Sequence, residues 1–63
     1  MKKMIPFIYR NFKYYLAVDE QKDTAAILDQ FQNTVSVTAM SDWGQSTEPL
    51  TQFAFHIYQS LIG

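Results

Sequence analysis

Few side chains in this sequence could carry chemistry, and His56, its single histidine, is the first to consider. A metal ion needs three or four ligands, and a general base needs a nucleophile within hydrogen-bond reach. The chain has no cysteine, and it contains no HExxH, GxSxG, P-loop or GxGxxG motif. We therefore predict no catalytic residue, no metal and no cofactor, and we do not expect an enzyme.

The carboxylates Asp19, Glu20 and Asp23 lie close together in the sequence and could offer oxygen ligands to a divalent cation. They lack the regular spacing and the downstream glutamate of a calcium loop. Carboxylates are also stabilised at the positive end of a helix dipole. Our interpretation is a solvated helix start rather than a metal site.

Cations and aromatic rings are interleaved near the amino terminus, a combination that binds single-stranded nucleic acid by phosphate contacts and base stacking. The residues that would form such a site are Lys2, Lys3, Arg10, Lys13 and Tyr15. The formal net charge is −1, and four cations give only weak, salt-sensitive binding. Nucleic-acid binding is therefore the alternative hypothesis.

The stretch from Met4 to Val18 predicts a hairpin that turns at Arg10-Asn11, because asparagine tolerates the left-handed conformation of a tight turn. A two-residue loop pairs Tyr9 with Phe12, and opposite residues then share a face. One face becomes entirely apolar or aromatic, with Ile5, Phe7, Tyr9, Phe12, Tyr14, Leu16 and Val18. A shift of one residue in the pairing register would distribute these residues over both faces of the hairpin.

The stretch from Ser46 to Gly63 predicts a closing amphipathic helix. Its apolar residues recur at helical spacing and are Leu50, Phe53, Ala54, Ile57, Tyr58 and Leu61. Ser46 or Thr47 can cap its amino end, and Pro49 suits the first turn. His56 falls on its polar side.

The pattern of residues 23–45 distinguishes helix from strand less clearly. Ala25, Ile27, Leu28 and Phe31 favour a helix over 23–32, with a strand over 24–32 as the rival interpretation. Residues 35–40 alternate between apolar and polar types, which predicts a half-buried strand. A loop is expected over 41–45.

These elements predict one small α+β domain over residues 1–63, in the order β-β-α-β-α. A three-stranded sheet, the amino-terminal hairpin plus one strand, would pack with two helices on one face. The middle helix would make a right-handed crossover if the second and third strands ran parallel. With 63 residues and no disulfides, stability is marginal.

In this layout the second sheet face stays bare, with Met4, Ile8, Tyr15 and Ala17 beside Lys13. Contiguous exposed apolar groups usually mark an interface. The alternative is that one helix covers each face and hides this patch in the core. Trp43 is either a core plug or a binding anchor, since tryptophan is enriched at interaction hot spots.

The function that follows is a small non-enzymatic binding protein that docks on a larger protein partner, with inhibition of that partner as one outcome. Homodimerisation is expected, because it would stabilise a marginal domain. The expected contact residues are Met4, Ile8, Lys13, Tyr15 and Trp43. No membrane partner is expected, because the charge-free run 49–63 is shorter than the roughly 20 residues of a spanning helix. The lack of cysteine fits the cytoplasm.

Overall fold

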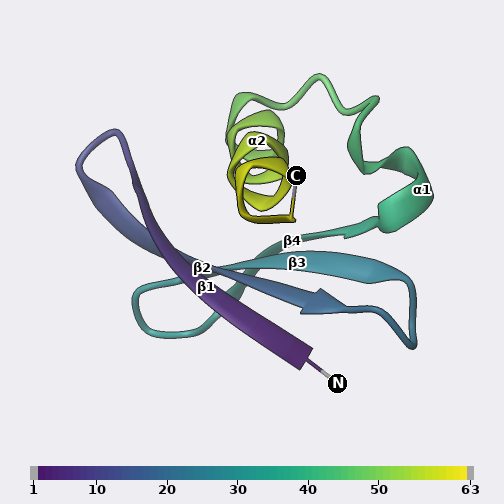
Figure 1. Ribbon diagram of the computed structural model, residues 1–63. Coiled ribbons are helices and arrows are strands. Elements are labelled where there is room, and N and C mark those ends of the chain that lie inside the picture. The colour runs from purple at the N-terminus through teal and green to yellow at the C-terminus, as the bar shows by residue number, and fades with distance from the viewer. Residues whose placement is uncertain (1, 63) are drawn as a thin grey trace.

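The computed structural model describes the chain from residue 2 to residue 62, with side chains from residue 4 onward. Its elements, in chain order, are β1 (Lys2–Tyr9), β2 (Phe12–Asp19), β3 (Thr24–Asp29), β4 (Thr34–Ala39), α1 (Met40–Trp43) and α2 (Pro49–Ile62). The strands form one antiparallel sheet in the order β1-β2-β3-β4. Both helices lie on the same side of this sheet (Figure 1).

The predicted three-stranded sheet and the order β-β-α-β-α are wrong. The sheet has four strands, the observed order is β-β-β-β-α-α, and every strand pair is antiparallel. The expected crossover helix over 23–32 is instead strand β3 and the turn after it. Because consecutive strands are neighbours throughout, the described chain contains no parallel crossover.

Two aspartates explain why the middle segment forms a strand. The Asp19 carboxylate accepts the backbone N–H groups of Gln21 and Lys22, at 3.1 and 3.2 Å, in the β2–β3 turn. The Asp29 carboxylate accepts two more N–H groups, both at 2.9 Å, in the β3–β4 turn. Such side-chain bonds favour turns over helix. Only six residues remain between the turns, and a segment this short has little helical stability of its own.

The amino-terminal hairpin has the predicted register. Tyr9 lies opposite Phe12, and the pairing continues to Lys2 opposite Asp19. Arg10 and Asn11 have φ values of 53° and 70°, the left-handed pair that a two-residue hairpin turn requires. The hairpin prediction is therefore confirmed, and it fixes which β1 and β2 side chains face the helices.

The core lies between the sheet and the two helices. Its buried residues are Phe7, Leu16, Val18, Ala25, Ile27, Trp43, Ala54 and Tyr58. Trp43 belongs to α1, a short helix that replaces the loop expected over 41–45. Its ring centre lies 5.2 Å from those of both Phe55 and Tyr58, so α1 attaches to α2 through aromatic contacts.

The closing helix is also confirmed. Ser46 Oγ accepts the N–H of Glu48 at 3.2 Å just before the helix begins at Pro49. Gln52 Nε2 donates to the Ser46 carbonyl at 2.8 Å, which fixes the entry of the chain into α2. Phe53 packs on Phe7 and Tyr9 of β1, with ring centres 5.9 and 5.0 Å away. Among residues 2–62, no helix has the length and apolarity that crossing a membrane requires.

Candidate protein-binding surface

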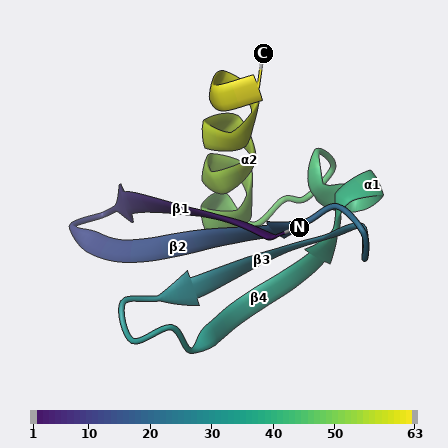
Figure 2. The same ribbon diagram turned by 60° about the horizontal axis from the view of Figure 1, so that its bottom comes forward.

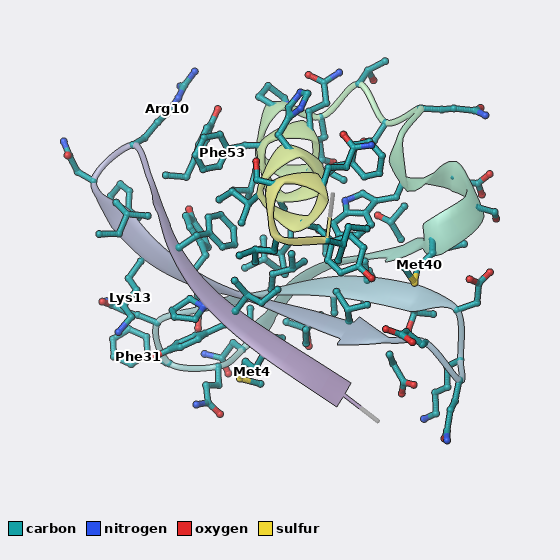
Figure 3. The ribbon with its side chains drawn as sticks, viewed as in Figure 1. Met4, Arg10, Lys13, Phe31, Met40 and Phe53 are labelled. Carbon is teal, nitrogen blue, oxygen red and sulfur yellow. The ribbon has the colours of Figure 1, made fainter. Side chains whose placement is uncertain are left out.

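The sheet face turned away from α1 and α2 has no covering element in the described chain, and we call it the open face. The register places its side chains in rows across the strands. One row runs Met4, Ala17, Ala26 and Val37, a second runs Pro6, Tyr15, Leu28 and Thr34, and a third pairs Ile8 with Lys13. Figure 3 shows Met4 and Lys13 on this side, opposite Phe53 of α2.

The open face is apolar across all four strands. Ile8 is 67% exposed, Val37 60% and Met4 49%. The residues between them in the rows, including Tyr15 and Leu28, are half-buried by their neighbours. A contiguous apolar surface of this kind usually marks an interaction site in a small protein.

A shallow hollow of about 280 Å³ lies in the open face. Its apolar lining comes from all four strands and consists of Met4, Ala17, Ala26, Leu28 and Val37. The polar side chains of Asp19, Lys22, Thr24 and Thr34 complete the lining. The volume of the hollow lies near the lower end of the range of about 300–1,000 Å³ for small-molecule sites. The hollow is also large enough to accept a side chain of a partner protein.

The charges of the open face lie toward its two ends. Lys13 Nζ is 5.2 Å from the centre of the Tyr15 ring, which places the cation over the aromatic face. Asp19 and Lys22 lie at the opposite end of β2 and in the turn that follows. An apolar centre with charges at its margins is the usual composition of a protein interface.

The acidic cluster is not a helix start, so that part of the sequence interpretation is wrong. Asp19 ends β2, Glu20 and Asp23 lie in the β2–β3 turn, and Asp23 has a φ of 57°. Within the part of the chain that the structure describes, no three residues of the types His, Cys, Asp and Glu are placed to hold a metal ion.

The structure brings together four of the five residues expected to bind a protein. Met4, Ile8, Lys13 and Tyr15 all lie on the open face. Trp43 does not, because it is 1% exposed and its indole N–H donates to the Thr51 carbonyl at 3.2 Å. Of its two interpretations, core plug or anchor, the structure shows the core plug.

The residues of the alternative nucleic-acid site do not gather on one surface. The Arg10 guanidinium lies 5.4 Å from the Tyr9 ring at the hairpin tip, while Lys13 lies on the open face (Figure 3). Lys13 lies over the Tyr15 ring and lines a hollow together with Phe31, and the side chains of Lys2 and Lys3 lie outside the described residues. Most hairpin rings instead pack toward α2, as the register predicted.

The β3 and β4 half of the open face does not follow from the predicted layout, because that layout places a helix over 23–32 where the structure has β3 (Thr24–Asp29). Leu28 and Val37 belong to this half, and Phe31 in the following turn is 76% exposed. The available signal was Asp29, whose carboxylate suits a turn. A turn at Asp29 predicts that the strand ends there and that Phe31 lies in the following loop.

No family model, no curated protein and no solved structure matches the chain, so the site is interpreted from its own geometry.

Proposed function

We propose that the protein is a non-enzymatic binding module that docks through its open face on an apolar surface of a larger protein. The observation that supports this is the apolar sheet face that no element of residues 2–62 covers. Burial of apolar surface contributes roughly 25 cal/mol per Å². Ile8, Met4 and Val37 still expose such surface, and a partner would remove it from water.

The size of the molecule indicates how the partner must engage it. The Cα trace measures 28 by 23 by 20 Å, and a stable interface buries about 800 Å² on each side. A partner therefore needs nearly the whole open face rather than one end of it. The complementary surface is apolar and carries a carboxylate placed to meet Lys13, because an opposite charge at the rim favours the correct orientation.

The proposal includes inhibition of the partner as one outcome of docking, and it places the protein in the cytoplasm. Support for the compartment comes from composition, since the chain has no cysteine for disulfide formation. The proposal assigns the protein no chemistry of its own.

The test compares capture by the wild type with capture by two variants that alter only the open face. Ile8→Glu on β1 and Tyr15→Glu on β2 add a carboxylate to the middle of the proposed contact. The matched control is Gln59→Glu, which adds the same group to an exposed position on α2. Circular dichroism spectra first establish that all three variants fold.

We expect a host-lysate protein that the wild type and Gln59→Glu retain and that both open-face variants lose. Retention of the same protein by all four chains would contradict docking through this face. Loss only with Gln59→Glu would move the contact to α2. If Tyr15→Glu unfolds, Ile8→Glu still decides, because its side chain is 67% exposed.

A further inference from the structure

The two edges of the sheet differ in how well they are protected from pairing with another strand. β1 forms one edge, and its Pro6 cannot donate a backbone hydrogen bond. β4 forms the other edge, and its sequence TVSVTA contains no charged residue and no proline. Natural proteins usually block an exposed edge with such residues. Figure 2 shows β4 at the margin of the sheet with no other ribbon along its outer side.

The backbone groups of β4 that point outward can be assigned from its pairing with β3. Met40 N–H donates to the Asp23 carbonyl at 2.9 Å, so Met40 is directed toward β3. Antiparallel residues alternate in direction along a strand. Thr38 and Ser36 are therefore directed toward β3 as well, while the N–H and C=O groups of Val37 and Ala39 point away from the sheet.

We propose that β4 pairs antiparallel with β4 of a second copy, about a two-fold axis that passes between the two Val37 residues. In this register Val37 faces Val37 of the second copy, and the two residues exchange two hydrogen bonds through groups that point outward. Val35 faces Ala39 of the second copy beside the register shift of β4, so the hydrogen bonds are assigned at Val37 alone. The product is a continuous eight-stranded sheet.

The partner is a second copy because the β4 edge is complementary to itself. When two copies of β4 run in opposite directions, Ser36 of one copy lies opposite Thr38 of the other on the side of the helices. On the open face, Val37 lies opposite Val37, and Val35 lies opposite Ala39. The strand carries no charge, so no like charges are opposed across the axis, where they would destabilise pairing. The register of β4 against β3 shifts between Thr34 and Ser36 and leaves Val35 without a Cα partner on β3, so the regular part of the edge begins at Ser36.

This arrangement has a consequence for the open face. Directly opposite residues of an antiparallel pair share a face, so the helices of both copies lie on one side of the eight-stranded sheet. The two open faces then join into one surface about twice as wide. Edge pairing nevertheless stands independently of the proposed docking, because it uses backbone groups of β4 and not the side chains of β1 and β2.

The first test is the solution mass measured by sedimentation equilibrium. The chain has a mass of 7.3 kDa, and we expect the wild type to approach twice this value as concentration rises. Val37→Pro removes an outward N–H and leaves in place the backbone groups that bond to β3. We therefore expect this variant to remain a monomer, with the mass of a single chain at every concentration. Val37→Thr keeps the N–H and the branched side chain, and we expect the wild-type mass.

The second test is disulfide cross-linking in a chain that has no natural cysteine. Val37→Cys places two thiols opposite each other, with Cα atoms about 5.5 Å apart, within the range a disulfide accepts. Val35→Cys is the control, since its two copies lie four residues apart along the strands, about 13 Å. We expect rapid cross-linking at position 37 and little at position 35.

A wild type that keeps the chain mass at every concentration would overturn the edge proposal. So would a dimer that Val37→Pro leaves intact, or equal cross-linking at both positions. If Val37→Pro does not fold, the cross-linking comparison decides. Ile8→Glu, which tests docking by the open face, should still form the dimer, so the two proposals fail separately.

Discussion

Trp43 offers the clearest energetic test of how the helices are held against the sheet. Its side chain is 1% exposed, its ring contacts Phe55 and Tyr58, and its indole N–H donates to the Thr51 carbonyl. Truncating a buried tryptophan to alanine costs about 3–5 kcal/mol. A domain of 63 residues has a total stability of roughly 3–9 kcal/mol. Trp43→Ala should therefore remove about a third or more of the free energy of unfolding, and all of it at the lower end of that range.

Trp43→Phe separates the ring contacts from the hydrogen bond. The variant keeps an aromatic ring but loses the indole N–H, worth about 0.5–1.5 kcal/mol, and part of the buried volume. We expect a loss of about 2 kcal/mol, which lowers the melting temperature of a domain this small by roughly 8–16 °C.

The assay is urea unfolding followed by far-ultraviolet circular dichroism, because Trp43 is the only tryptophan and its fluorescence is lost on substitution. The control is Phe31→Ala, an aromatic truncation at a site that is 76% exposed, which should change stability by less than about 0.5 kcal/mol. Equal effects of Trp43→Ala and Phe31→Ala would refute the core role of Trp43 and the attachment of α1 to α2.

Three further predictions follow from single contacts. Asp29→Ala removes the acceptor of two turn N–H groups and should lower the free energy of unfolding by about 1–2 kcal/mol in a urea titration, whereas Asp29→Asn, which keeps an acceptor oxygen, should cost less. Gly44→Ala places a Cβ 3.0 Å from the Phe55 ring, and this crowding costs about 1–3 kcal/mol against a gain of about 0.4–1 kcal/mol from the stiffer unfolded chain at a helical φ of −68°. We expect a small net loss in thermal unfolding, and a clearly raised melting temperature would show that the Phe55 ring moves aside. The wild type should not be retained on immobilised single-stranded DNA at low salt, because Arg10 and Lys13 lie apart; retention that Arg10→Glu with Lys13→Glu abolishes would instead favour the nucleic-acid hypothesis.

The amino-terminal hairpin and the closing helix could be predicted because their evidence is local. The seven apolar or aromatic residues on one hairpin face fix the register without knowledge of the remaining chain. The stripe of α2 repeats for three turns, and Pro49 marks where the helix begins. In both segments the side-chain period agrees with the local turn or cap residues.

β3 could not be predicted with the same certainty, because Ala25, Ala26, Ile27 and Leu28 follow each other without a gap. Such a short apolar run does not distinguish a strand from a helix. Its conformation is determined by pairing with β2, where Ala25 and Ile27 lie opposite Val18 and Leu16, and by the two aspartate turns. The first of these is tertiary information that the periodicity of one segment does not contain.

The candidate surface was correspondingly half predictable. Met4, Ile8, Lys13 and Tyr15 were placed together by the hairpin register alone. Leu28 and Val37 required the correct assignment of β3, since they share the open face only in a four-stranded sheet. Trp43 could not be assigned from sequence, because burial and exposure are equally compatible with tryptophan beside a turn.

The central claim is that one apolar face of the sheet is uncovered, and methyl NMR with a soluble paramagnetic probe measures this most directly. The probe enhances the relaxation of methyl groups that solvent reaches. Strong enhancement is expected for Ile8 and Val37 of the open face, and weak enhancement for Leu16 and Ile27, which are 0% and 2% exposed. Protection of Ile8 and Val37 equal to that of Leu16 would contradict an uncovered face.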